Sequence, residues 1–419
     1  MSQDEPEAPQ PVNRLALIFI FITALLDSIG FGIILPVFPQ LIVDITGESI
    51  AAAASYGGWL MFTFAVMQFL FAPLIGNLSD HYGRRPVLLV SLFVMAINYV
   101  LMAVAGSLLL LFIGRLLSGI GASTHSTCNA YIADTVPEDQ RAQYFGIMGA
   151  AFGMGFILGP VIGGLLGDFG PRTPFYAAAA LCVLNMLFGL LVLKESLAPE
   201  DRRKFDLGRA NPFGTFAALS VNPMIIGIIA VMFMMQLGHF VLPATWSFFT
   251  IERFDWTSRE VGYSLGFVGV CMVLVQVFVL RLVVPAVGLR MAGVIGMLFN
   301  IVAFCGYALA TAPWMLYAAL VPGALGALAQ PAQQGIVTAQ AARTQQGELQ
   351  GGIASVNSLA AIISPPLMAQ TFAWFSSSSA PVYFPGAAFV LAALFTAIGL
   401  AIFVVITARL APELRRISR

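Results

Sequence analysis

The chain has 419 residues, of which 59% are hydrophobic and only 10% are charged, and its mean hydropathy is +0.89. A water-soluble domain carries about 25% charged residues, so this composition indicates a polytopic membrane protein. Twenty basic and twenty acidic residues cancel, which leaves no positive field for nucleic acid.

The chain begins with thirteen residues that are acidic and contain proline. They lack the basic region and short apolar core of a signal peptide, so we expect residues 1–13 to form a disordered cytoplasmic tail. A membrane-spanning helix needs about 20 apolar residues. Apolar runs separated by charges and turns predict twelve spans, at 14–43, 55–78, 86–105, 108–133, 142–166, 173–193, 223–250, 258–282, 289–310, 313–340, 348–374 and 382–408.

The longest interruption, 194–221, is a basic stretch that we interpret as a cytoplasmic linker. It separates one six-helix set at 14–193 from another at 222–410, and a tail follows at 411–419. With both termini in the cytoplasm, sixteen Lys and Arg residues lie inside and three outside. The positive-inside rule therefore predicts this orientation.

The two sets repeat at one fixed offset of 205 residues. The matching pairs are Gly83 with Gly288, Arg85 with Arg290, Gly121 with Gly326, Gly146 with Gly351 and Pro160 with Pro365. A repeat of this kind is typical of transporters with a site between their halves. We therefore predict an all-α fold of twelve transmembrane helices in two pseudo-symmetric six-helix bundles.

Two charges, Asp27 and Arg115, lie inside predicted spans. A charge in the hydrocarbon core costs at least ~2.5–3.5 kcal/mol and by default marks a functional site. Our hypothesis is that the two residues face each other across a cavity in the first half. Asp27 would then gain and lose a proton, with Arg115 beside it; a fixed structural ion pair is the alternative.

Other polar residues recur at helical spacing inside the spans, and we interpret them as the walls of a substrate cavity. Buried amides need hydrogen-bond partners, so a structural network between helices is the rival interpretation. The predicted cavity residues are Gln68, Ser118 and Asn129 in the first half and Gln236, His239, Phe240, Gln330, Gln333 and Gln334 in the second.

Two further motifs indicate moving parts. The segment after the second span carries Gly76, Asp80, Gly83, Arg84 and Arg85, and with Asp134 we expect it to form a cytoplasmic gate. Asp80 and Arg84 are four residues apart and can pair. The fifth span carries glycines at four-residue spacing, which suits close helix packing, around a proline that bends the helix. This predicted hinge comprises Gly155, Gly159, Pro160, Gly163 and Gly164.

The loop motif resembles the helix 2–3 signature of the major facilitator superfamily, and the run from Arg115 to Gly121 is similar to its second signature. The Gly-Pro-Gly-Gly run of the hinge resembles that of proton-exchanging exporters in this superfamily. The segment from Leu26 to Pro39 is similar to the first helix of tetracycline/proton antiporters, and the likeness covers nearly the whole chain. The resemblance implies a proton-coupled exporter of amphipathic drugs such as tetracyclines, working by alternating access.

The same resemblance implies a small amphipathic substrate, protons and membrane lipid as partners, a monomer, and a bacterial inner membrane location. It also implies that Asp80 and Arg84 latch the cytoplasmic gate of the outward-open form. The chain departs from the enteric exporters where they carry carboxylates in helices 3 and 9 and a histidine in helix 8. Here these positions hold Asn98, Asn300 and Met272.

Other functions stay open at this point: export of an endogenous metabolite or lipid-like compound, proton-coupled uptake, or a receptor that transports nothing. The sequence has no Gly-rich phosphate loop followed by Lys and Ser or Thr. Its three histidines and four cysteines lack metal-ligand spacing. We therefore expect no enzyme activity, no cofactor and no metal.

Overall fold

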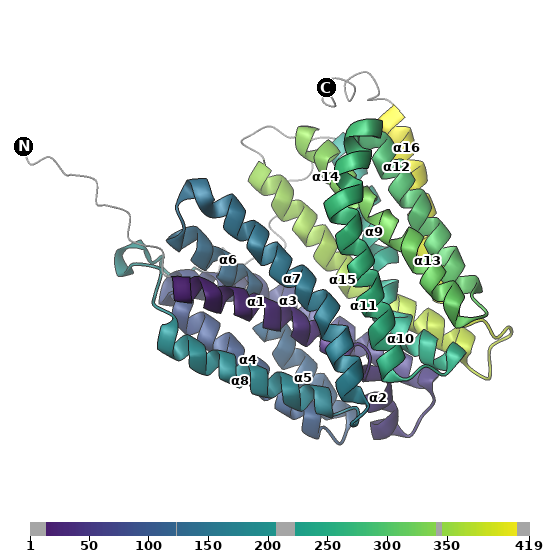
Figure 1. The fold of residues 1–419 in the computed structure, drawn as a ribbon, viewed down its shortest axis with the longest axis horizontal. Coiled ribbons are helices and arrows are strands. Elements are labelled where there is room, and N and C mark those ends of the chain that lie inside the picture. The colour runs from purple at the N-terminus through teal and green to yellow at the C-terminus, as the bar shows by residue number, and fades with distance from the viewer. Residues whose placement is uncertain (1–13, 123, 207–222, 341–345, 409–419) are drawn as a thin grey trace, which may run out of the picture.

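The computed structural model describes residues 14–122, 124–206, 223–340 and 346–408, and every regular element in these ranges is a helix (Figure 1). The predicted all-α fold is confirmed. The predicted tails at 1–13 and 411–419 and residues 207–221 of the predicted linker lie outside the described residues.

The first half contains eight helices within the described ranges. They are α1 (Arg14–Ile34), α2 (Phe38–Thr46), α3 (Ile50–Tyr82), α4 (Arg84–Val104), α5 (Leu108–Gly121), α6 (Thr124–Thr135), α7 (Glu138–Gly167) and α8 (Thr173–Val192). A short 3₁₀ turn, η1 (Pro199–Asp201), follows.

The second half repeats this plan. Its elements are α9 (Pro223–His239), α10 (Val241–Phe254), α11 (Ser258–Leu274), the π-helical turn η4 (Val275–Val279), α12 (Leu280–Leu309), α13 (Pro313–Leu325), the 3₁₀ turn η5 (Gly326–Leu328), α14 (Ala329–Gln340), α15 (Gln346–Ser376) and α16 (Ala387–Ala408).

Eleven helical stretches of the described chain are long and apolar enough to cross a membrane. One of them, Ser258–Leu309, has 52 residues. At 1.5 Å per residue it would be about 78 Å long, more than twice the ~30 Å hydrocarbon core. Gly288 has a φ of 76° and interrupts the helix there, so this stretch supplies two spans and the described chain has twelve.

Four of the predicted spans are broken inside the bundle instead of continuous. The breaks separate α1 from α2, α5 from α6, α9 from α10, and α13 from α14. In two cases a proline (Pro39 or Pro331) lies four residues after a residue of the break, and Pro243 lies three residues after Phe240. A proline ring clashes with the carbonyl four residues earlier, which explains why the helix stops there.

The last span begins at Ala387 and not at residue 382. Pro385 and Gly386 immediately precede it, and the missing proline N–H and the flexible glycine both disfavour a helix at these positions.

Helices α1–α8 form one bundle and α9–α16 the other, and the two meet at one end of the molecule (Figure 1). We call this the Arg172 end, after the residue between α7 and α8, and the opposite end the Arg84 end. The largest apolar core combines buried residues of both bundles, including Phe38 and Phe248. Two smaller cores each belong to a single bundle.

The surroundings of the glycines show how closely the two bundles approach each other. A Cβ on Gly164 would lie 2.6 Å from the Ser258 carbonyl oxygen, and one on Gly58 would lie 2.6 Å from the Ala369 Cβ. Both contacts cross between bundles at the Arg172 end. At the Arg84 end, a Cβ on Gly76 or Gly146 would meet nothing within 4 Å. The bundles are therefore joined at one end and separated at the other.

Candidate functional site

Helices α1 and α7 pack closely against each other because α7 presents glycines to the backbone of α1. A Cβ on Gly155 would lie 2.9 Å from the Ile29 backbone nitrogen, and one on Gly159 would lie 2.8 Å from the Ile29 carbonyl oxygen. A Cβ on Gly163 would collide with the Ile33 carbonyl. Only glycine permits this approach, and α1, which carries Asp27, is fixed by it.

The predicted hinge residues thus have two different neighbours. Gly155, Gly159 and Gly163 face α1 within the first bundle, while Gly164 faces Ser258 and Gly262 of α11 in the second bundle. Pro160 lies inside the continuous helix α7. The structure brings all five residues together along one helix at the bundle interface.

Asp27 lies in the interior of the first bundle and is half-buried. It interacts electrostatically with Tyr99 of α4, Cys128 of α6 and Cys182 of α8. Among the described residues it has no hydrogen-bond or ion-pair partner. A carboxyl group left unpaired inside a membrane bundle is costly and marks function.

Arg115 projects from α5 and is only 8% exposed. Its guanidinium lies 4.7 Å from the centre of the Phe38 ring, a cation–π contact, and its Nε has no hydrogen-bond partner. The described ion pairs do not join it to Asp27. The two residues predicted to face each other are therefore not in direct contact in this conformation.

Tyr99 is the residue that relates the two charges, and sequence reasoning missed it. It is 2% exposed, and it interacts electrostatically with both Asp27 and Arg115. Its ring packs on Gly30 of α1, where any Cβ would strike the phenol oxygen. A tyrosine in the middle of an apolar span, beside Asn98, was the available signal.

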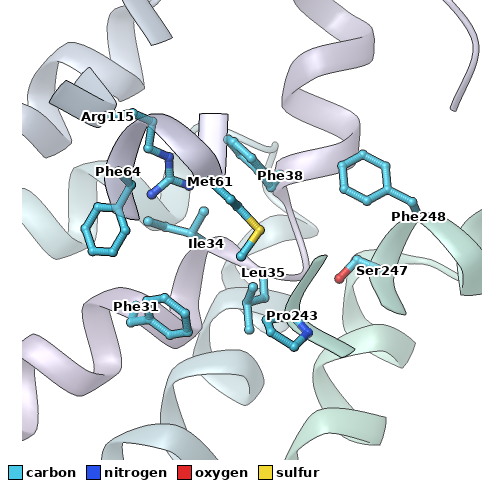
Figure 2. Close-up of a pocket in the computed structure, with 10 residues that line it drawn as sticks. All are labelled: Phe31, Ile34, Leu35, Phe38, Met61, Phe64, Arg115, Pro243, Ser247 and Phe248. Atoms are coloured by element: carbon cyan, nitrogen blue, oxygen red, sulfur yellow. The ribbon is translucent and has the colours of Figure 1, made fainter. Parts of the chain in front are cut away.

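Arg115 points into a small apolar pocket between the bundles (Figure 2). Helix α1 supplies Phe31 and Ile34, and α3 supplies Met61 and Phe64. Helix α10 of the second bundle closes the pocket. No predicted cavity residue other than this arginine lines it, so the aromatic wall of the pocket is a second feature that the sequence analysis did not identify.

The second bundle has a separate polar pocket. Four of the predicted residues line it together: Gln236, His239, Gln330 and Gln333. Gln333 is 2% exposed, and its Nε2 has no hydrogen-bond partner. Asn357 of α15 completes the pocket and was missed, because a single amide in a long apolar span gives little signal.

The remaining predicted cavity residues are not brought into these pockets. Ser118 is buried and donates its hydroxyl to the Arg115 carbonyl at 3.3 Å. Gln334 donates to Gln350 of α15 at 3.2 Å. Gln68, Asn129 and Phe240 are half-buried, and Phe240 lies at the break between α9 and α10.

The predicted gate residues form a charged cluster at the Arg84 end. Arg84 Nη1 lies 2.5 Å from an oxygen of Asp80, and its Nε donates to Asp134 at 3.0 Å. Glu195 of the linker, which was not predicted, accepts from the Arg84 backbone N–H at 2.8 Å. An acid at a helix N-terminus complements the helix dipole, so Glu195 stabilises the start of α4.

The other gate residues fix this turn. Gly83 has a φ of 105°, which favours glycine, and a Cβ there would collide with Glu195. Arg85 donates to the Leu190 carbonyl at 3.1 Å. Gly76 faces open space. All hydrogen bonds that this cluster forms with described residues lie within the first bundle and its linker, so no bond between described residues bridges the bundles here.

Two asparagines occupy positions where the resemblance implies carboxylates. The side chain of Asn98 is buried without a hydrogen-bond partner. Asn300 donates to the Gly326 carbonyl at 3.3 Å and also interacts with His239. Neither introduces a charge, so Asp27 and Arg115 are the charged groups at the centre of the described bundles.

Two helical bundles joined at one end, with isolated charges and amides between them, define a membrane transporter. The chain belongs to the major facilitator superfamily, whose sequence pattern matches residues 20–365. It is 38% identical to the Escherichia coli tetracycline resistance protein of class C, over 85% of this chain and 90% of that protein. Identity to the class B protein of Escherichia coli is 36%, over 85% of this chain and 88% of that protein.

Solved structures show the same fold. The nucleoside transporter NupG superposes with a TM-score of 0.75 at 14% identity, covering 94% of this chain and 98% of that one. The family prediction is confirmed, and these relatives support the prediction of a drug efflux transporter. The chain is a multi-pass protein of the bacterial inner membrane.

Proposed function

We propose that this protein exports amphipathic drugs, tetracyclines among them, in exchange for protons. The observation that carries the proposal is Asp27, a carboxyl group in the interior of the first bundle that has no ion-pair partner among the described residues. Such a group can bind and release a proton as its surroundings change. The tetracycline resistance proteins, similar over most of the chain, support the choice of substrate.

We further propose that both termini are cytoplasmic, which makes the Arg84 end the inner end. The described conformation is then open to the cytoplasm and closed outside. Substrate enters between the bundles, the bundles rock, and Asp27 takes up a proton from the outside after substrate has left. The protein works as a monomer, and its central site comprises the predicted cavity residues of both bundles.

The Arg84 cluster supports a role as the inner gate. Its charges pair within one bundle while the inner end is open. When the inner end closes, Asp80 and Arg84 latch the first bundle to the second. Gly76 leaves the space for that approach.

The test is transport in proteoliposomes with an imposed pH gradient, with tetracycline as the substrate. The wild-type protein should drive tetracycline uphill against the proton flow, and Asp27→Asn should bind tetracycline yet fail to couple. A variant that still pumps with normal proton coupling overturns the proposal. A growth-inhibition panel in an efflux-deficient host tests the drug range.

A further inference from the structure

The pocket around Arg115 has a chemical character of its own. One cation projects into a wall built otherwise of aromatic and aliphatic side chains (Figure 2). Phe31 and Phe38 come from α1 and α2, and Met61 and Phe64 come from α3. These side chains can contact a flat apolar body that carries one charged group. The pocket is only about 30 Å³ in this conformation, so such a ligand enters when the bundles separate around it.

The arginine has unused capacity to bind an anion. It is more than nine-tenths buried, its Nε has no hydrogen-bond partner, and its described neighbours include no carboxylate within ion-pair distance. A buried charge of this kind is normally compensated by an opposite charge. The Phe38 ring offers only a partial compensation.

The position of the pocket connects it to transport. Pro243, Ser247 and Phe248 of α10 line it from the second bundle, opposite Arg115 of the first. A ligand held there touches both bundles, so it is released or gripped when they move. The pocket therefore lies on the path that the bundles open and close.

We infer that this pocket is an anion-binding subsite, in which Arg115 binds the negatively charged group of an amphipathic aromatic substrate. Guanidinium binds planar oxyanions through two parallel hydrogen bonds, so carboxylates, sulfonates and delocalised enolates are the fitting groups. The aromatic wall takes the apolar body. The inference rests on the proposed export function and narrows its substrates to amphipathic anions and zwitterions.

The test compares two fluorescent probes that differ by one charged group. They are 8-anilinonaphthalene-1-sulfonate and its uncharged parent N-phenyl-1-naphthylamine, titrated against the purified full chain in detergent, with empty micelles as the baseline. Arg115→Gln should raise the Kd of the sulfonate about tenfold or more, because it removes charge-assisted hydrogen bonds. The Kd of the uncharged amine should change by less than about twofold.

Arg253→Gln is the matched control, since it removes one exposed positive charge at the Arg172 end, outside the pocket. It should change neither Kd. An Arg115→Gln protein that binds the sulfonate normally, or that loses both probes equally, overturns the inference.

A second measurement uses the unaltered protein and so does not depend on the folding of a variant. 2-Naphthylacetate should displace the bound sulfonate probe at a concentration about tenfold lower than 2-naphthylacetamide, its uncharged counterpart of similar size. Equal displacement by the two overturns the inference. Both experiments measure binding without a proton gradient, so a failure of proton coupling in Asp27→Asn does not affect their outcome.

Discussion

The two bundles present different chemistry to the space between them. The first bundle offers Asp27 and Arg115, two charges that form no ion pair within the described part of the chain. The second offers uncharged amides and an imidazole, at Gln236, Gln333 and His239. The backbones repeat, down to a left-handed glycine at Gly83 and at Gly288, while the central side chains do not.

We propose that the two repeated bundles have different roles in transport. Charges couple to protons and bind anions over distance, whereas amides recognise shape and hydrogen-bonding pattern. Sequence repeats therefore reveal the scaffold, and departures from the repeat reveal the chemistry. The predictions below set a change in one bundle against a change elsewhere.

The largest effect is expected at Asp27. Asp27→Asn keeps the volume and removes the titratable group, so proton-driven tetracycline accumulation should fall to the level of protein-free vesicles. Transport in proteoliposomes measures this. Asp44→Asn, an exposed acid at the end of α2, is the control and should pump normally; equal activity of both variants contradicts the proton role.

A smaller effect is expected at the gate. Arg84→Ala removes charge-assisted hydrogen bonds to Asp80 and Asp134, each worth about 1.5–3 kcal/mol, and should slow the transport rate several-fold with little change in Kd. Within the described ranges, the side chain of Arg290 at the equivalent turn donates to Thr407 alone. Arg290→Ala should therefore transport at near the normal rate, and if it is impaired as strongly, the two turns are functionally equivalent.

The polar pocket of the second bundle should influence the affinity for substrate more than the stability of the protein. Gln333→Leu removes a buried donor without a partner, so the melting temperature should stay constant or rise. The Kd for tetracycline should increase by about three- to tenfold, the value of one hydrogen bond of about 1 kcal/mol. Scanning calorimetry and binding titration together distinguish a substrate cavity from a structural network. A lower melting temperature with an unchanged Kd favours the structural network.

The smallest effect is expected where the bundles meet. Gln370 Nε2 donates to the Ser55 hydroxyl at 2.7 Å across the interface. Ser55→Ala should shift the balance between open and closed outer ends by no more than about 1 kcal/mol. A double-mutant cycle with Gln370→Ala, read by distance measurements across the outer end, would reveal the coupling; strict additivity would show that this bond plays no part in closure.

Much of the fold could be predicted from the sequence. Hydrophobic runs predicted the spans within a few residues, because the thickness of the bilayer fixes the length of a helix. The fixed offset that pairs Gly83 with Gly288 predicted the repeat. The helix breaks were missed, although Pro39, Pro243 and Pro331 lie three or four residues after them, because a proline in a membrane helix produces either a kink or a break.

Fewer residues of the candidate site could be predicted from the sequence. Composition singles out a charge in an apolar run, which is how Asp27 and Arg115 were found. It does not tell which aromatic side chains face a cavity and which face lipid, since Phe31, Phe38 and Phe64 resemble every other phenylalanine in the chain. Tyr99 and Asn357 were identified as site residues only from the packing of the helices. This packing places Tyr99 near Asp27 and Arg115, and Asn357 in the polar pocket of the second bundle.

The interrupted helices carry a further consequence. Each of the four breaks falls in the first helix of a group of three, so the discontinuities recur at the same place in every quarter of the chain. At the first break the amides of Leu35 and Val37 donate to carbonyls only three residues earlier, at Gly32 and Ile34, and non-helical backbone at membrane depth is tolerated only inside protein or beside water. Deuterium should therefore enter the amides of Leu35 and Val37 faster than those of the continuous helices α1 and α2 on either side, which would identify this break as a flexible point near the bundle interface.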